Sequence, residues 1–379
     1  MRRRGWDVTL LAGSLEQDPT PGHTTVDDVD VVRYRIPRGP FGMGRHLRAE
    51  IAAMSAAVGR RLAGQWDIVH VHAPMPALAI DDVVPPDRVG RRVYTLHSPA
   101  SRELAANAVG AGWAPIARRR VGGWLLERIE GRALARADAI HVLSQYSAQL
   151  VKEIHGPAVA SKLTPIPWFV EHDVHGAVAA VADRAHARLH LGWPVVGFHA
   201  ITVRRLVPRM GVDTLVRANA LLPEDAKIWI HVIGDGPQRA SLERLASSGR
   251  RSAALTFHGR LSDADVEAAY AAADVFVLPT TALEGFGLII LEALAHGVPV
   301  IGADVGVIPE VLGRVDPDAL VRTADAAALA QKILALASHG VAPETRAALA
   351  QRVRNEFPRN RTLDKYEAFL AGSASVHAD

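Results

Sequence analysis

Short apolar runs alternate with amphipathic segments along most of the chain. In the first half, runs of strand length lie at residues 8–12, 29–34, 67–72, 92–97 and 139–143, and helical spacing occurs at residues 45–63 and 117–137. In the second half, strands are predicted at residues 195–200, 227–233, 254–258, 274–278 and 298–302. The helices predicted there lie at residues 212–222, 238–247, 263–273, 288–296 and 325–337. Strands that alternate with helices indicate parallel sheets with helices on both faces.

The alternation breaks once, around residues 165–175, where an Ala-rich polar stretch follows Pro167-Trp168-Phe169. We therefore predict an α/β protein with two Rossmann-like, doubly wound parallel-sheet domains that face a cleft. The N-terminal domain covers residues 1–170 and the C-terminal domain residues 171–360. A last helix, within residues 361–379, is expected to pack back toward the N-terminal domain. Ligands of such sheets bind outside the carboxyl ends of the strands.

Composition narrows the function classes. The 379 residues contain no cysteine, which excludes disulfides, cysteine-based zinc sites and thiol nucleophiles. A net charge of +3 and only 5% aromatic residues give no reason to expect nucleic acid as a partner. No apolar run reaches the roughly 18 residues that would cross a bilayer. The basic start, residues 1–5, is interpreted as the end of a helix that leads into a strand rather than as a signal peptide, because its apolar core is too short.

The strongest chemical pattern is Glu284-Gly285-Phe286-Gly287-Leu288, which opens a predicted helix that carries Glu292. The two glycines allow the backbone to approach a ligand closely. Free N–H groups at a helix start suit a diphosphate, whereas carboxylates suit the vicinal hydroxyls of sugars. A nucleotide sugar combines both groups. The alternative interpretation, a loop carboxylate at Glu284 and a solvated one at Glu292, is disfavoured because the residues around Glu292 are apolar.

A second pattern is Arg204-Arg205-Leu206-Val207-Pro208-Arg209-Met210-Gly211, after the strand predicted at residues 195–200. Arginines at a strand end, before a helix that starts at glycine, suit a diphosphate. The alternative is that Arg204 and Arg209 are solvated and only Arg205 acts. A Gly-Asp-Gly sequence at residues 234–236 is not a dinucleotide fingerprint, since Arg239 stands where a third glycine is required.

At these residues the chain resembles the family 4 retaining glycosyltransferases, which have the GT-B fold. The family pattern is two glutamates separated by seven residues. The second glutamate is followed by alanine, and Gly-x-Pro-Val comes after it. Here it runs from Glu284 to Glu292-Ala293 and Gly297-Val298-Pro299-Val300. The resemblance continues through segments at residues 233–237, 257–259, 270–274 and 308–311, and it is densest from residue 195 to residue 312.

The resemblance implies roles for individual residues. Glu292 would bind the ribose and Glu284 the transferred sugar, while Arg205 would neutralise the diphosphate. The family lysine that follows corresponds to Met210, and we predict that the neighbouring Arg209 supplies the missing charge. His97 corresponds to the family's cleft histidine, and Ser144 matches a further family position. The donor pocket would comprise Gly236, Arg260, Leu261, Gly285, Phe286, Gly287, Leu288 and Glu292.

The chain departs from the family at its start, because Arg4-Gly5-Trp6-Asp7-Val8 corresponds to the second strand. The first strand and its Gly-rich loop have no counterpart, so the sheet is expected to expose unpaired backbone edges.

Two further patterns favour structural interpretations. His70 and His72 share one face of a strand, but no third metal ligand is evident. Arg118, Arg119 and Arg120, with Trp113 and Trp124, are interpreted as a solvated arginine face with tryptophans in the core. A basic helix on a membrane surface is the alternative.

The predicted function is glycosyl transfer from a nucleotide diphosphate sugar, UDP- or GDP-linked, with retention of configuration. No metal and no other cofactor are expected. The acceptor would be a carbohydrate, a lipid-linked sugar or a small-molecule hydroxyl. The alternatives are a sugar-nucleotide-binding protein without transfer activity and another GT-B enzyme such as a sugar-nucleotide epimerase. The predicted location is the cytoplasm, with peripheral contact to the inner membrane face left open.

Overall fold

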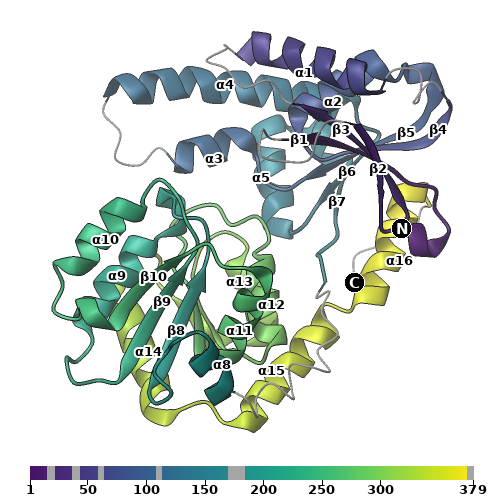
Figure 1. The fold of residues 1–379 in the computed structure, drawn as a ribbon. Helices are drawn as coiled ribbons and strands as arrows, with labels where there is room; N and C mark the ends of the chain where they lie inside the picture. The colour runs from purple at the N-terminus through teal and green to yellow at the C-terminus, as the bar shows by residue number, and fades with distance from the viewer. Residues whose placement is uncertain (15–21, 36–42, 59–63, 108–112, 170–183, 374–379) are drawn as a thin grey trace.

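Two α/β domains lie side by side and are joined by the last two helices of the chain (Figure 1). The computed structural model describes residues 1–14, 22–35, 43–58, 64–107, 113–169 and 184–373. The boundary predicted between residues 170 and 171 therefore lies outside the described residues. Below, "N-terminal domain" means the elements up to residue 169, and "C-terminal domain" those from residue 184 to residue 356.

The N-terminal domain holds two sheets. One has the order β1-β3-β2, formed by β1 (Thr9–Ser14), β3 (Val29–Arg35) and β2 (Gly22–Val26). The other has the order β4-β5-β6-β7, formed by β4 (Trp66–Val71), β5 (Val89–Leu96), β6 (Ala139–Val142) and β7 (Leu163–Pro165). Its α-helices are α1 (Met43–Val58), α2 (Pro74–Val83), α3 (Ala100–Ala106), α4 (Trp113–Arg136), α5 (Gln145–His155) and α6 (Pro157–Ala160).

This arrangement differs from one continuous parallel sheet. Among the described residues, β1 is hydrogen-bonded only to β3, and β4 only to β5, so each has one unpaired edge. The strand β2, which the sequence did not indicate, pairs antiparallel with β3. Asp27 and Asp28 join the two strands with φ values of 49° and 62°. Two left-handed residues in succession make the tight turn that suits a right-twisted hairpin. The polar composition of Gly22–Val26, exposed along its whole length, explains why no apolar pattern revealed it.

The C-terminal domain contains one six-stranded parallel sheet with the order β10-β9-β8-β11-β12-β13. Its strands are β8 (Phe198–Val203), β9 (Ile228–Ile233), β10 (Leu255–Gly259), β11 (Val275–Leu278), β12 (Val300–Ala303) and β13 (Leu320–Val321). Its α-helices are α8 (Arg184–His190), α9 (Val212–Leu221), α10 (Arg239–Ser247), α11 (Asp263–Ala272), α12 (Leu288–Ala295), α13 (Ile308–Val315), α14 (Ala326–His339) and α15 (Pro343–Glu356). The predicted doubly wound parallel sheet is confirmed here.

The buried residues of β11 show how both faces of this sheet are covered. Val275 and Val277 pack in one apolar cluster with α9 and α14, whereas Phe276 and Leu278 pack in another with α12 and α13. All four side chains are fully buried. A strand buried on both faces reads as a continuous apolar run, which is why its position was predictable.

The last helix, α16 (Arg359–Ala371), lies against the N-terminal domain (Figure 1). Phe369 and Leu370 pack with Val93 of β5 and Ala139 of β6. Arg4 also forms ion pairs with Asp364 and Glu367 of this helix, at 2.7 and 2.8 Å. The chain thus ends on the domain in which it began.

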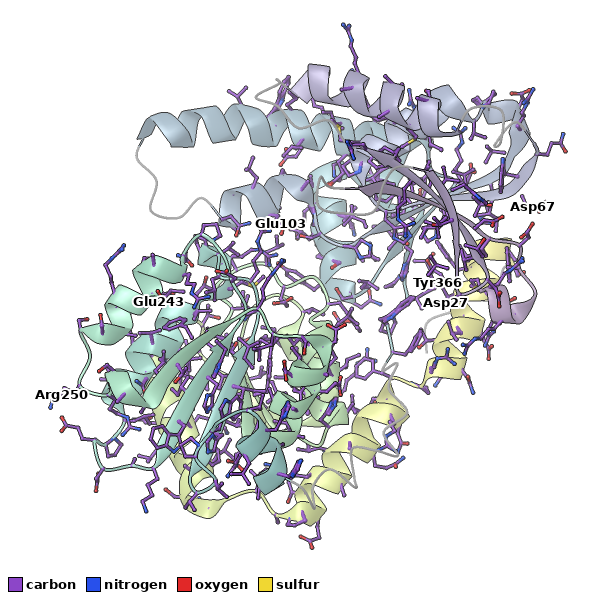
Figure 2. The ribbon with its side chains drawn as sticks, viewed as in Figure 1. Asp27, Asp67, Glu103, Glu243, Arg250 and Tyr366 are labelled. Atoms are coloured by element: carbon purple, nitrogen blue, oxygen red, sulfur yellow. The ribbon has the colours of Figure 1, made fainter. Side chains whose placement is uncertain are left out.

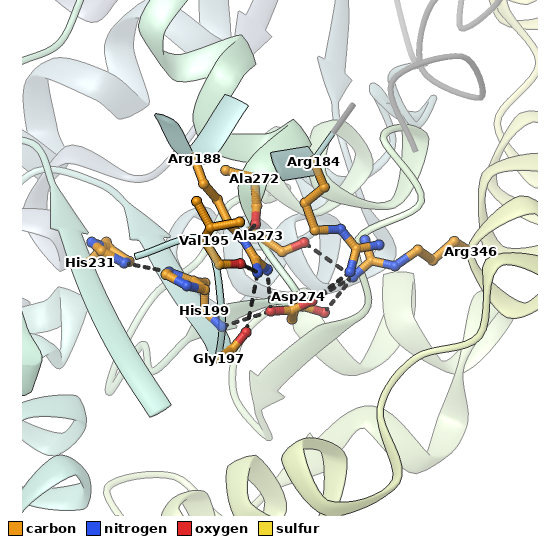
Figure 3. Close-up of polar contacts among 10 residues, drawn as sticks. All are labelled: Arg184, Arg188, Val195, Gly197, His199, His231, Ala272, Ala273, Asp274 and Arg346. Carbon is orange, nitrogen blue, oxygen red and sulfur yellow. Dashed lines mark hydrogen bonds and ion pairs between the residues drawn. The ribbon is translucent and has the colours of Figure 1, made fainter. Parts of the chain in front are cut away.

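A buried ionic cluster lies at the amino-terminal ends of the strands of the large sheet (Figure 3). The carboxylate of Asp274, immediately before β11, accepts hydrogen bonds from Arg188 and Arg184, at 2.7 and 2.8 Å, and from the backbone N–H of His199. Arg346 of α15 adds a longer contact of 3.4 Å to the same carboxylate. Burial lowers the pKa of Arg346 to about 10. The cluster joins α8, β8, β11 and α15 at the end of the sheet opposite the strand carboxyl ends.

Helix α4 corrects one prediction about tryptophan. Trp124 is 55% exposed rather than in the core, and the guanidinium of Arg128 lies 4.7 Å from the centre of its ring. The side chains of residues 113–120, with the triple arginine, lie outside the described residues. Within the part of the chain that the structure describes, no helix is both long and apolar enough to span a membrane.

Candidate active site

The strand order of the C-terminal domain alone indicates where a ligand would bind. Its order reverses between β8 and β11, the two neighbouring central strands. Chain segments leave such neighbours in opposite directions, so a crevice opens at their carboxyl ends. The segment that begins with Arg204 follows β8 directly, and the segment that leads to Glu284 follows β11. The two patterns singled out in the sequence therefore meet at this switch point.

Two glycines set the shape of the loop that enters α12. Gly287 has φ 70° and caps the helix at Leu288, a conformation that glycine adopts without strain. A Cβ on Gly285 would lie 2.4 Å from the backbone oxygen of His97, so only glycine fits between the loop and the N-terminal domain. Within this loop, Phe286 is buried against Phe357 of the core, whereas Leu288 is 43% exposed at the helix start. Phe286 thus anchors the loop, and the side chain of Leu288, the first residue of α12, stays partly exposed.

Glu284 is bound by Arg204, which was not among the predicted site residues and which the alternative interpretation of the sequence placed in solvent. Arg204 Nη2 lies 3.1 Å from Glu284 Oε2, and Thr280 Oγ1 donates to the same oxygen at 3.2 Å. Arg204 Nη1 donates to Thr280 Oγ1 at 2.9 Å. The Arg204 side chain is only 4% exposed, and burial lowers its pKa despite the favourable charge of Glu284.

The other two arginines have different surroundings. Arg205 is exposed. Arg209 reaches toward the N-terminal domain, where its Nη2 lies 2.7 Å from Glu103 Oε1 of α3. Its Nη1 donates to the backbone oxygen of Leu283 at 2.8 Å. Figure 2 shows Glu103 on the side of α3 that faces the C-terminal domain.

Glu292 has the partner that a carboxylate in an apolar helix requires. Tyr270 Oη, on α11, donates to Glu292 Oε2 at 3.1 Å. Burial, followed by the charge of Glu292, raises the pKa of Tyr270. The hydroxyl therefore stays protonated and donates, which leaves the second carboxylate oxygen of Glu292 for other groups.

The remaining predicted donor residues lie along the neighbouring strand ends. A Cβ on Gly236 would lie 2.4 Å from the backbone oxygen of Leu206, so the loop after β9 touches the arginine segment after β8. Arg260 follows β10 and is exposed, and Leu261 packs partly buried against the core. Together they continue the row of strand-end segments from β8 to β10.

His97, at the end of β5, is tied to a second histidine. His97 Nε2 lies 3.1 Å from His72 Nδ1, and the two rings stack at 5.4 Å. Burial lowers the pKa of His97, and burial together with His97 lowers that of His72 to about 4. Both imidazoles are therefore neutral at pH 7, and the N–H of one donates a hydrogen bond to the other.

The hydrogen bonds behind this pair determine the tautomer of His70. His141 Nε2 lies 2.9 Å from the backbone oxygen of Ile166, so that nitrogen carries the proton, and its pKa, lowered to about 4, leaves Nδ1 as an acceptor. The hydroxyl of Thr95 then donates to His141 Nδ1 and accepts from His70 Nε2, at 3.1 and 2.7 Å. Tyr366 of α16 contacts the same nitrogen of His70 at 3.3 Å. His70 is thus part of the packing of α16.

Serine hydroxyls and a glutamate connect the two domains beside His97. Ser144 and Ser147, at the start of α5, both donate to the backbone oxygen of Gly285 at 3.1 Å. The carboxylate of Glu310 accepts from the backbone N–H groups of Gln145 and Tyr146, each at 3.1 Å. These contacts hold the loop before α12 against the N-terminal domain.

Sequence reasoning named Arg205, Arg209, His97 and the segment from Glu284 to Glu292, and all lie at or beside the switch point. It did not identify Thr280, Ser147 or Glu103 as parts of the site. Each contacts a residue at least 76 positions away in the sequence, and no local spacing signals such a contact. Among the described residues, no group of three or more His, Asp or Glu side chains could hold a metal ion.

Comparison with known proteins gives two family matches. Residues 183–356 match the family described as glycosyl transferases group 1, and residues 1–168 match the glycosyl transferase 4-like domain. The chain is 31% identical over 325 residues to the D-inositol 3-phosphate glycosyltransferase of Mycobacterium tuberculosis (strain ATCC 25618 / H37Rv). The match covers 82% of this chain and 62% of that relative, so the chain spans less than two thirds of the relative's length.

Solved structures share the fold at lower identity. Sucrose-phosphate synthase from Thermosynechococcus elongatus superposes with a TM-score of 0.76 and 23% identity, covering 98% of this chain and 91% of that one. HepE of Anabaena, in complex with UDP and glucose, gives a TM-score of 0.67 and 18% identity, covering 90% and 86%. WaaG, a glycosyltransferase involved in lipopolysaccharide biosynthesis, gives 0.67 and 16%, covering 98% and 93%.

Proposed function

The chain belongs to the group 1 glycosyl transferases of family 4, with the GT-B fold, and from this premise we propose that it transfers a sugar from a nucleotide diphosphate sugar with retention of configuration. In this reaction the bond between the anomeric carbon and the diphosphate oxygen breaks. The anomeric carbon forms a bond to the acceptor oxygen on the same face. The acceptor's proton passes to the β-phosphate oxygen or a nearby group, and the nucleoside diphosphate leaves.

The observation that carries the proposal is the pair Glu284 and Glu292 on either side of the N-terminus of α12, at the switch point of the sheet. Helix N-termini and arginines suit the diphosphate, and the two carboxylates suit hydroxyl pairs on either side of it. Glu292, with one oxygen held by Tyr270, is assigned to the ribose. Glu284, nearer the N-terminal domain, is assigned to the transferred sugar.

The leaving diphosphate gains negative charge as the sugar departs. Positive groups aimed at this charge lower the barrier, because they bind the transition state better than the ground state. Arg205 is exposed at the crevice and is assigned this role, and Arg209 is the second candidate from the sequence. The backbone N–H groups at the start of α12 add the positive end of the helix dipole.

His97 is assigned a contact with the transferred sugar. It lies where Gly285 meets the N-terminal domain, and its lowered pKa keeps the imidazole neutral at pH 7. A neutral imidazole can donate to or accept from a sugar hydroxyl without adding charge. His72 holds one of its nitrogens, which fixes the orientation of the ring.

The donor is proposed to be UDP- or GDP-linked, with no further cofactor. The structures of HepE with UDP and glucose, and with UDP-glucose, support a UDP-sugar. The proposed acceptor is a hydroxyl of a carbohydrate, a lipid-linked sugar or a small molecule. A cytoplasmic location is proposed, where nucleotide sugars would be available, with peripheral membrane contact for a lipid-linked acceptor.

A thermal-shift panel of UDP-, GDP-, ADP- and dTDP-sugars tests the donor class. A ligand that binds only the folded state raises the melting temperature, so one nucleotide should stand out. The donor that binds is then incubated with a panel of acceptors, and the anomeric configuration of the product is read by NMR. Inverted product would contradict retention. Binding without transfer to any acceptor would favour the binding protein.

Turnover should survive EDTA. The proposed diphosphate site offers arginines and a helix N-terminus, which neutralise the leaving group without a cation. Initial rates with and without EDTA measure this directly. Complete loss of turnover that returns with Mg²⁺ or Mn²⁺ would show that a metal ion neutralises the diphosphate instead.

A further inference from the structure

Arg209 is already committed to other groups. Its guanidinium bridges Glu103 of the N-terminal domain and the backbone oxygen of Leu283, at 2.7 and 2.8 Å, and its side chain is 14% exposed. To reach a phosphate, it would have to leave both partners and break a contact between the domains. These contacts make Arg209 a tie between the domains.

The guanidinium of Arg204 lies instead against Met210, the residue in the position of the family lysine. Arg204 Nη2 is 2.8 Å from Met210 Sδ, and Nη1 is 3.3 Å from the Met210 backbone oxygen. The same guanidinium contacts Thr280 and Glu284, which follow β11. The positive charge of Arg204 therefore lies beside Met210, which stands where the family has a charged lysine.

The contacts of Arg204 leave one buried donor unused. Its Nε is buried and has no hydrogen-bond partner among the described residues. Arg209 Nε is also buried and unpaired, so the two arginines are distinguished by their other contacts, which are with Glu103 for Arg209 and with Met210 for Arg204. Buried donors are nearly always paired in folded proteins, and an unpaired one calls for an explanation. A guanidinium carries five N–H donors, so it can keep Glu284 and still donate to a phosphate oxygen.

We propose that Arg204, not Arg209, is the second cation for the donor diphosphate, acting beside Arg205 at the end of β8. Glu284 and Thr280 hold the guanidinium in place while the crevice is empty. When the donor binds, its sugar hydroxyls engage Glu284 and its diphosphate engages Arg204. This inference rests on the proposed function and assigns one of its residues.

The test compares ligands that differ only in phosphate number. Calorimetry gives the affinities for UDP and UMP, for GDP and GMP, and for inorganic pyrophosphate. The Arg204→Met variant should lose about ten- to a hundredfold in diphosphate affinity, as expected for a hydrogen bond between charged groups. Its monophosphate affinity should change far less. In the Arg204→Met background, Met210→Lys should restore part of the diphosphate affinity, because it returns a cation to the same place.

Two controls separate charge from structure. Glu284→Gln in the Arg204→Met background removes the unpaired carboxylate, and the selective diphosphate loss should persist. Glu103→Gln releases Arg209, and the ratio of diphosphate to monophosphate affinity should not change. Circular dichroism checks the fold, and Arg204→Gln allows the same comparison if Arg204→Met does not fold.

Three results would overturn the assignment or its premise. Equal losses of UDP and UMP affinity in Arg204→Met would mean that Arg204 only supports the fold. A selective diphosphate loss in Arg209→Met but not in Arg204→Met would return the role to Arg209. Wild-type protein that binds none of the nucleoside diphosphates would overturn the proposed function itself, a result distinct from the other two.

Discussion

Glu284 and Glu292 are the same residue type in different surroundings. Glu284 accepts from a buried arginine and a threonine, whereas Glu292 accepts from a tyrosine hydroxyl. Removal of Glu284 leaves the positive charge of Arg204 unpaired, while removal of Glu292 leaves only a neutral hydroxyl. The two glutamates should therefore respond differently to a free nucleotide.

We predict that Glu292→Ala weakens binding of free UDP or GDP about tenfold or more, because a carboxylate that holds the ribose is lost. Glu284→Ala should have a smaller effect, since its proposed partner, the sugar, is absent from the free nucleotide and Arg204 becomes freer to bind phosphate. Isothermal titration calorimetry measures both. Tyr270→Phe is the matched control, because it keeps the carboxylate. A larger loss for Glu284→Ala would reverse the two roles.

The elements around the site were predictable to different degrees. The strands β8, β9, β11 and β12 were located within a few residues, because each is buried on both faces and reads as an apolar run. The segment β13 has two residues and gives no periodicity. Helices α13 and α15 were not predicted, although their apolar faces pack in the same core. A strand as short as β13 shows no pattern in the sequence, and α13 and α15 are stabilised by packing against residues distant in the sequence.

Gly211 shows how two of these elements are held together at the site. It begins α9 with φ 65°, and a Cβ there would lie 1.9 Å from the backbone oxygen of Pro279, which follows β11. The segments after β8 and β11 can touch only because this residue has no side chain. Alanine would be strained in its backbone conformation and would overlap a rigid neighbour.

We predict that Gly211→Ala lowers the free energy of unfolding by about 2–4 kcal/mol, from the left-handed conformation and the overlap together. Gly313→Ala is the matched control within α13, where no atom lies within 4 Å of the added Cβ. It should raise stability by about 0.5–1 kcal/mol, because alanine favours a helix. Chemical denaturation measures both variants. Equal stability of the two would contradict the close approach.

At the scale of the whole molecule, neutral histidines lie in both domains. Burial is the main cause in each case: it lowers the pKa of His70 to about 3, that of His72 to about 4 and that of His199 to about 3. Electrostatic interactions with neighbouring groups lower these pKa values further, from His72 for His70 and from Arg188 for His199. All three are uncharged in the folded protein at pH 7.

Stability should therefore fall as the pH drops below about 6.5, the pKa of histidine in an unfolded chain. Between this value and the folded pKa values near 4 and below, the unfolded state binds more protons, and acid favours it. Each buried histidine contributes a slope of at most about 1.4 kcal/mol per pH unit. Denaturant titrations between pH 7.5 and 5.5 measure the slope above the range in which carboxylates titrate.

The His72→Asn variant is the matched control, because it removes one titrating group and keeps a polar side chain. Its stability should depend less steeply on pH than that of the wild type. An unchanged slope would mean that His72 binds protons equally in the folded and unfolded states, in contradiction to its lowered pKa.

The sequence by itself determined the alternation of strands and helices, and with it the fold class, the family and the segments that form the crevice. Local periodicity and residue type carry this information, because a strand buried on both faces must be apolar and a loop that another backbone segment approaches closely favours glycine. The tertiary structure decided which charge goes where. Arg204 pairs with Glu284 across 80 positions of sequence, and Arg209 pairs with Glu103 across 106. Such pairings depend on which strand ends become neighbours in the fold, and no local pattern in the sequence indicates which distant residues will meet.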